Sequence, residues 1–324
     1  MSGVKVQGRL VYVIMTTYEF RLRFRFPQQS RIAEDAESIS LTMPDDGQKV
    51  MLQSRPASEL INSRLLDAIA GDFPSIEVAT SYGNRIRSAI IICCALLGMG
   101  VDIDEHEETL DVPHIQIAPS GQGYVTPSSL NGLVVYPQGV KVHRVSVDFS
   151  SHGGPTSEQF QKVFVKSFDL SMNLNDRLKL AFELYNSHYF ETSIHARFLQ
   201  LITTIECLSE PRKQPDLIVS HIQNIISSSE QHLGTLEGLS NDDRKYFLQR
   251  LDQLKQESIS SACRNLVHKH LGTDAVKIFN DCYKIRSKIT HKGRTPPNSD
   301  LLDHYFKLDQ LTRKLLHILI SGQT

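Results

Sequence analysis

The sequence predicts an α+β protein with two domains, a mixed α/β domain at residues 1–155 and an all-α up-and-down bundle at residues 173–324. Two patterns predict this division. In the first half, short β-branched and alternating runs are typical of strands. In the second half, apolar residues recur at spacings of three and four, which is typical of helices that bury one face. Short connections between these helices favour antiparallel neighbours.

The strongest strand signal is the strict alternation of residues 19–26. Phenylalanine and leucine occupy one face, and Arg21, Arg23 and Arg25 occupy the other. We interpret the arginine face as the solvated side of a half-buried sheet, with contact to an RNA backbone as the alternative. Further elements of the first half are expected as strands at residues 10–15, 39–43, 49–52, 132–136 and 140–148, and as helices at residues 58–70 and 84–97.

A change of character marks the expected domain boundary. The segment Ser-His-Gly-Gly-Pro at residues 151–155 is typical of a connector, so the boundary is predicted within residues 150–172. Helices are then expected at residues 176–185, 194–208, 215–229, 242–258, 278–293 and 299–320. Gly293 and the following Pro296-Pro297 predict a sharp end to the fifth of these helices.

Composition excludes several classes of protein. The formal net charge of −1 provides no global basic field, so nucleic acid could bind only through a local patch. The five cysteines form no Cys-x-x-Cys pair and are interpreted as reduced core thiols. The histidines show no ligand spacing for a metal, and no cofactor motif occurs, so neither is expected. We expect a cytoplasmic protein with no signal peptide and no membrane span.

One short motif suggests chemistry. Arg286 and His291 are separated by four residues near the expected helix end, where the helix dipole favours a protonated imidazole. An arginine binds a phosphate and offsets its charge, while a histidine protonates a leaving oxygen. The spacing alone is weak, because 19 arginines and 13 histidines give roughly two such matches by chance. The second match, Arg264 and His270 with Asn265 between them, is a rival pair or a solvated helix face.

Neighbouring residues complete the candidate site. Glu206 could pair with Arg286, or it could lie on a solvated helix edge. Because one histidine cannot easily serve as both acid and base, we expect a homodimer through the helical domain. Residues expected to support catalysis are Ser287, Glu206 and Tyr283, and those expected to contact RNA are Lys288, Lys292 and Arg294.

Three stretches resemble the ApeA-like branch of the HEPN family, and they occur in that family's order. They are LAFELYN at residues 180–186, ARFLQLITTIECL at 196–208 and CYKIRSKITHKG at 282–293. The resemblance covers roughly residues 175–320 and favours Arg286/His291 as the catalytic pair. Ser287 departs from the Asn, Asp or His that many active members carry at this position.

The resemblance implies a metal-independent ribonuclease or RNase toxin of prokaryotic antiphage defence or a toxin–antitoxin system. RNA would be the substrate, and a protein regulator or antitoxin would be a further partner. The first domain would then sense a trigger or restrain activity. The alternative is a non-catalytic HEPN module that dimerises and binds a protein partner.

Overall fold

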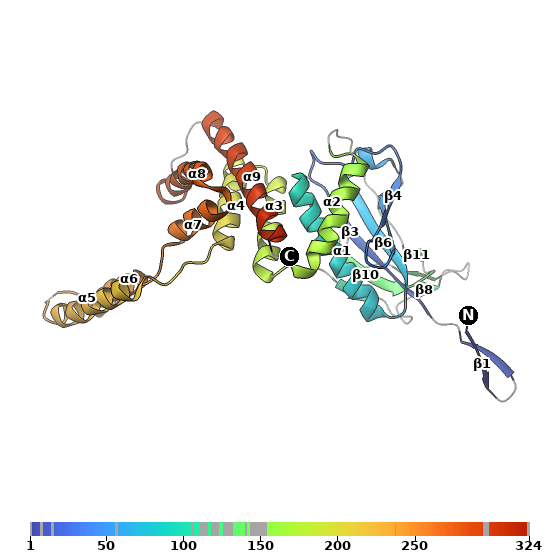
Figure 1. Cartoon of the computed structure of the whole chain (residues 1–324), viewed down its shortest axis with the longest axis horizontal. Helices are drawn as coiled ribbons and strands as arrows, with labels where there is room; N and C mark the ends of the chain where they lie inside the picture. The colour runs from blue at the N-terminus through green and yellow to red at the C-terminus, as the bar shows by residue number, and fades with distance from the viewer. Residues whose placement is uncertain are drawn as a thin grey trace. The chain divides into compact units, whose positions relative to one another are not determined.

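The computed structural model describes residues 2–6, 9–13, 16–55, 58–104, 107–109, 116–117, 123–125, 132–139, 141–142, 154–236, 238–293 and 298–322. It confirms a mixed α and β protein (Figure 1). The chain divides into two compact units. Unit 1 comprises Met1–Arg197 with Leu316–Thr324, and unit 2 comprises Phe198–Leu315. The predicted boundary at residues 150–172 does not coincide with this division.

Unit 1 is built on a six-stranded sheet with the order β4-β5-β6-β3-β10-β7. Neighbouring strands are antiparallel except for β10 and β7, which are parallel. The strands are β3 (Tyr18–Arg25), β4 (Ser38–Thr42), β5 (Lys49–Ser54), β6 (Leu65–Phe73), β7 (Glu107–Thr109) and β10 (Gly132–Pro137). A hairpin of β1 (Ser2–Val6) and β2 (Arg9–Val13) and a small sheet of β8 (Gln116–Ile117), β9 (Gly123–Val125) and β11 (Lys141–Val142) complete its strands within the described ranges.

One face of the main sheet packs against helices. The apolar residues of β3 predicted to point inward are buried, with Phe20, Leu22 and Phe24 fully inaccessible. Helices α1 (Ile76–Leu97) and α2 (Ser157–Leu170) lie side by side on this face (Figure 1). The approach of α1 is close, because a Cβ on Gly83 would lie only 2.5 Å from Leu133 of β10. The absence of a side chain at Gly83 therefore allows α1 to pack this close to the sheet.

The other face of β3 corrects a prediction. Arg21 and Arg23 are only 8% and 5% exposed, so the interpretation of a solvated arginine face is wrong for both. The cause is the fully buried Asp67 of β6, which pairs with Arg23 across the strands and lies 2.9 Å from Arg55 Nε. Only Arg25 of the three is exposed, and its Nε contacts Asp102 at 2.5 Å.

The expected helix at residues 58–70 is also wrong. The chain there forms a short 3-10 turn, η1 (Leu60–Asn62), and then strand β6. Leu66, Ala68 and Ala70 alternate inward and are buried in the sheet. The apolar residues of this segment fit both a helical repeat and the two-residue repeat of a strand. Hydrogen bonding to β3 and β5 makes the segment a strand, because tertiary contacts override local propensity.

Helices α2 and α3 (Asp176–Ser187) belong to unit 1. The capping box of Thr156 and Gln159 begins α2 directly after the expected connector, inside the region predicted to hold the domain boundary. Helix α3 is tied to α1, because the Asn186 amide donates to Ile91 O at 2.9 Å. Two 3-10 turns, η3 (Ser171–Asn173) and η4 (His188–Phe190), flank α3.

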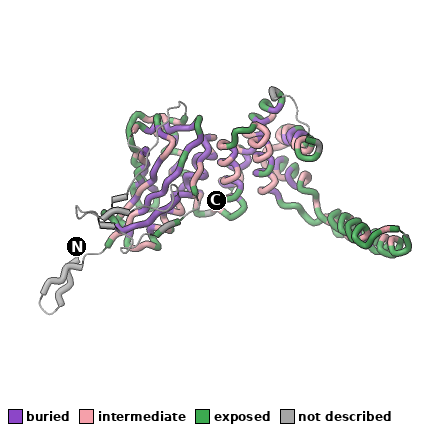
Figure 2. Tube along the Cα trace, turned by 180° about the vertical axis from the view of Figure 1, so that it is seen from behind, coloured by how far each residue is buried: buried purple, intermediate pink, exposed green. Residues whose placement is uncertain are grey.

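Unit 2 consists of helices within its described residues. Its core is formed by the second part of α4 and by α7, α8 and α9, whose apolar stripes are buried (Figure 2). Helices α5 and α6 form an arm beside this core (Figure 1). The expected helix at 242–258 ends earlier, and a further helix, α7, follows it. The bounds are α4 (Ile194–Leu208), α5 (Asp216–Gly234), α6 (Asn241–Gln253), α7 (Ile259–Leu271), α8 (Thr273–Lys292) and α9 (Asn298–Ser321).

Candidate active site

The candidate site is built on α8, whose end is fixed by Gly293. This glycine adopts the left-handed conformation with φ of 58°, and its N–H donates to Lys288 O. The predicted helix end is thereby confirmed, since glycine takes this conformation at low cost. His291 is consequently the second-last residue of the helix and is exposed. The unpaired carbonyls of the last turn stabilise a cation at this position.

A polar cluster joins α8 to α4. The Tyr283 hydroxyl donates to Glu206 Oε1 at 2.9 Å, and Arg286 Nη2 lies 3.4 Å from the same oxygen. The Arg286 guanidinium also lies 5.5 Å from the centre of the Tyr283 ring. Of the two alternatives for Glu206, the structure shows the pairing with Arg286. Glu206 restricts the rotamer of Arg286, and the arginine side chain remains 26% exposed to solvent.

Electrostatics keep Tyr283 a neutral donor. Burial raises the pKa of Tyr283, and so do its hydrogen bond to Glu206 and the charge of that carboxylate. The positive charge of Arg286 acts in the opposite direction, and the resulting pKa is about 12. At neutral pH the hydroxyl therefore keeps its proton, so the hydrogen bond that orients Glu206 is maintained.

His291 does not converge with Arg286 on a single helix. Helix α8 is unbroken to Lys292, and the Thr290 hydroxyl donates to Arg286 O at 2.9 Å, as in a regular turn. The helix therefore stays regular up to His291. On a regular helix, with about 100° of rotation per residue, two side chains five residues apart point in directions that differ by about 140° around the axis. Within one copy, a site that uses both side chains therefore depends on the reach of the long Arg286 side chain.

The other predicted residues are placed as follows. Ser287 is half-buried on α8, one residue after Arg286, and Lys288 is exposed on the last turn before the cap. The side chain of Lys292 and the whole of Arg294 lie outside the described residues. The expected RNA-contacting set is thus represented by Lys288.

The rival pair lies on α7 and has a different environment. Arg264 is exposed, and the Asn265 amide donates to Glu257 Oε1 at 2.5 Å. Burial lowers the pKa of His270, and the charge of Lys269 lowers it further. A lowered pKa means that a smaller fraction of this imidazole carries the proton that a general acid would donate. These positions fit the solvated helix face better than a site built to hold a charged pair.

Comparison with protein-family models, curated proteins and solved structures gives no match. Among the described residues, no group of histidine, cysteine, aspartate and glutamate side chains is arranged to hold a metal ion. No helix in the same part of the chain is both long and apolar enough to cross a bilayer.

Unit 1 contains a cavity that sequence reasoning missed. It has a volume of about 410 Å³, and its lining includes Arg25, Arg87, Asn186 and Phe190. Both arginines are paired with carboxylates, at 2.5 Å to Asp102 and 3.1 Å to Glu107, so the cavity carries no excess of positive charge. Its lining comes from four separate segments, and no contiguous motif could have revealed it.

Proposed function

We propose that this protein is a metal-independent endoribonuclease of the HEPN type, with Arg286 and His291 as its catalytic residues. The proposal rests chiefly on one observation: Arg286 is held by Glu206 and Tyr283 on the helix whose C-terminus carries His291. The resemblance of residues 175–320 to the ApeA-like branch supports the same pair. Prokaryotic antiphage defence or a toxin–antitoxin system is the proposed setting, with cytoplasmic RNA as the substrate.

The chemistry requires two proton transfers around one phosphate. The 2′-oxygen attacks phosphorus and loses its proton to a base, while the bond to the 5′-oxygen breaks and an acid protonates that oxygen. An imidazolium at the end of α8 is suited to the second transfer. Arg286 would bind a non-bridging oxygen and stabilise the charge that develops there.

Two copies of α8 complete this mechanism. In a two-fold dimer, one His291 acts as base and the other as acid, and an arginine from either protomer reaches the phosphate. In this arrangement the Arg286 and His291 side chains that meet at the phosphate can come from different copies of α8, so their divergence of about 140° within one helix is no obstacle. Unit 1 would act as the regulatory or trigger-sensing part.

A second candidate function is a non-catalytic module that binds another protein. The observation that favours it is the arm of α5 and α6, which exposes several large apolar side chains. Such a protein would retain the fold and the Glu206–Arg286 pair without cleaving RNA. Regulation by an antitoxin is compatible with either candidate.

Cleavage of a labelled single-stranded RNA by the full-length protein tests the proposal. With EDTA present, wild type should give products that end in a 2′,3′-cyclic phosphate, because the 2′-oxygen is the nucleophile. Arg286→Ala and His291→Ala, purified in parallel, should lose activity at least 100-fold, whereas His270→Ala should retain it. Activity retained in full by His291→Ala would exclude this assignment of the site.

A further inference from the structure

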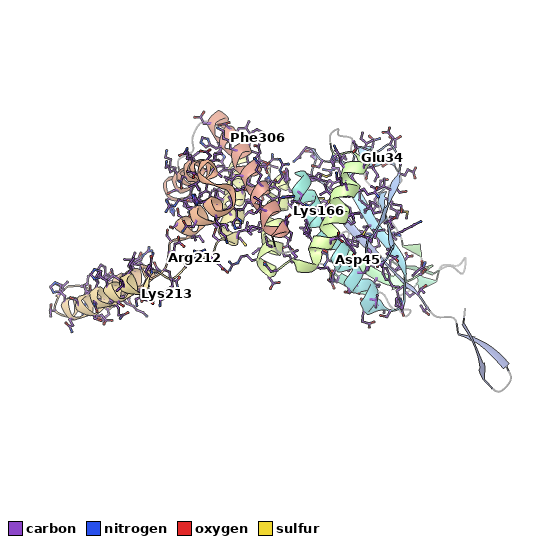
Figure 3. All side chains as sticks on the ribbon, viewed as in Figure 1. Glu34, Asp45, Lys166, Arg212, Lys213 and Phe306 are labelled. Atoms are coloured by element: carbon purple, nitrogen blue, oxygen red, sulfur yellow. The ribbon has the colours of Figure 1, made fainter. Side chains whose placement is uncertain are left out.

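The arm leaves the core of unit 2 through a two-stranded neck. Gln214 N–H donates to Lys255 O at 2.9 Å, and Glu257 N–H donates to Arg212 O at 2.8 Å. Figure 3 labels Arg212 and Lys213 where the chain enters α5. The paired neck holds the two ends of the arm together, so α5 and α6 run antiparallel as one hairpin (Figure 1).

The arm buries very little of its own surface. Of the described residues, α5 buries only Ile222 and Ile226, and α6 buries none. The arm is exposed along its length (Figure 2). Most of the stability of a helix in a protein comes from packing of an apolar face, and α5 and α6 bury little of theirs. A further packing partner is therefore expected.

Large apolar side chains are concentrated on this arm. Of the fifteen that are exposed in the described part of the chain, seven fall between residues 217 and 254. The most exposed is Leu217, at 86%. The seven are Leu217, Ile218, Ile225, Leu236, Tyr246, Phe247 and Leu254.

Four of these residues lie on one face of the hairpin. On α5, Ile218 and Ile225 are seven apart, about 60–80° to one side of the stripe that faces α6. Phe247 of α6 and Leu254, the residue that follows the end of α6, are also seven residues apart. Their directions differ by a similar angle from that of the half-buried stripe of α6 that faces α5. Two antiparallel helices are related by a local two-fold axis perpendicular to the plane that contains both helices. Side chains turned by the same angle from the facing stripes of α5 and α6 therefore lie on the same face of the hairpin. We call these four residues the arm face.

Spacing along the arm makes the face regular. Counted from the pairing of Lys213 with Gln256 in the neck, Ile218 and Leu254 lie near the neck, and Ile225 and Phe247 lie further along the arm. Each helix thus presents apolar residues one heptad apart, the repeat that packs helices in bundles. Beside them, a groove of about 920 Å³ is lined in part by Val219, Phe247, Leu251 and Leu254.

We propose that the arm face binds the arm face of a second copy of this chain, forming a four-helix bundle across a two-fold axis. The four residues are 40–56% exposed. Taking a full area of about 190 Å² for each, within the range of about 150–250 Å² that aromatic side chains bury, they expose roughly 350 Å² of apolar surface per copy. Since interfaces are about 57% apolar, this implies roughly 1,200 Å² in total, the lower end of the range for specific complexes. The groove would receive side chains of the partner arm.

Charge also fits self-association. The half near the neck, residues 211–222 and 249–258, carries four cations and three anions. Residues 223–248 carry four anions and two cations. An antiparallel dimer places the anionic half of one arm against the cationic half of the other, and isologous symmetry repeats the contact. The near-neutral total provides no basic surface for nucleic acid.

The mass of the full-length protein in solution tests this proposal without RNA. A dimer that survives disruption of the arm face would overturn it and leave the nuclease assignment unaffected, whereas a wild-type monomer would count against both. Light scattering after size exclusion should give twice the chain mass of 36.6 kDa. The double variant Ile225→Asp/Phe247→Asp should weaken dimerisation at least 100-fold and elute as a monomer. Both side chains are exposed, so circular dichroism of this variant should retain the helical signal of unit 2.

The matched control places the same two charges on the opposite side of the arm. Ser227 and Gln249 are exposed there, and Ser227→Asp/Gln249→Asp should remain dimeric. A wild-type monomer at micromolar concentration would overturn the proposal. A dimer that survives Ile225→Asp/Phe247→Asp would also overturn it, because the interface would then lie elsewhere. Equal loss of the dimer in both double variants would overturn it as well, because the effect would then not depend on the arm face.

Discussion

Replacing Glu206 by glutamine removes one charge from the polar cluster and keeps its shape. At 3.4 Å, the Glu206–Arg286 attraction is of order 5 kcal/mol at an effective dielectric constant of about 20, before desolvation is subtracted. The side chains are 17% and 26% exposed, so the pair is intermediate between a surface pair and a buried one. We expect a net loss of about 1–3 kcal/mol in the free energy of unfolding of unit 2.

The same substitution has a spectroscopic signature. Glu206 helps to raise the pKa of Tyr283 to about 12, after burial as the main cause. In Glu206→Gln the carboxylate charge is absent, so the pKa of Tyr283 should fall toward its ordinary value of 10.0 while burial keeps it above that value. Absorbance at 295 nm during alkaline titration measures this, and the difference between variants with and without Tyr283→Phe isolates the one tyrosine.

Activity should follow from the freed arginine. If Arg286 binds the scissile phosphate only when Glu206 orients it, RNA cleavage by Glu206→Gln should fall roughly 10-fold, within the range expected for a lost positioning contact. Cleavage at the wild-type rate, together with an unchanged titration of Tyr283, would refute the reasoning that Glu206 positions Arg286.

Three further predictions concern the fold. Asp67→Asn leaves the surrounding arginines without their buried carboxylate and should cost about 3–5 kcal/mol, measured by denaturant unfolding; a loss below 1 kcal/mol would show that the pairing adds little. Gly83→Ala should lower the melting temperature through overpacking worth about 1–3 kcal/mol, whereas Gly234→Ala, with open space at its Cβ, should be neutral or slightly stabilising. Burial raises the pKa of the Cys263 thiol to about 11 and that of the Cys282 thiol to about 12. At pH 8 both thiols should therefore resist alkylation until denaturant is added. Fast labelling of the native protein would contradict their burial.

Local patterns predicted much of the helical unit. Helix α4 lies where its apolar stripe predicted it, and α8 ends at Gly293 because the αL conformation there suits only a few residue types. The Glu206–Arg286 pair could also be anticipated, since each residue flanks a core stripe on its own helix. Periodicity identifies which side of a helix is buried, and this constrains which polar neighbours can meet.

Other features depend on contacts that no local pattern contains. Arg21 and Arg23 of β3 are buried because both lie close to Asp67, on a strand that the sequence pattern favoured as a helix. The cavity beside Asn186 joins segments about 160 residues apart. Helix α2 was missed because the connector pattern before it masked the capping box that begins it. In each case the deciding interaction is long-range.

Cleavage of RNA by wild type and by His291→Ala, measured side by side in EDTA, tests the central claim most directly. Wild type should release fragments ending in a 2′,3′-cyclic phosphate, and His291→Ala should lose this activity at least 100-fold while remaining folded. Equal cleavage by the two proteins, or no cleavage by a wild-type protein that is fully dimeric and stably bound to a protein partner, would contradict it and favour the binding module.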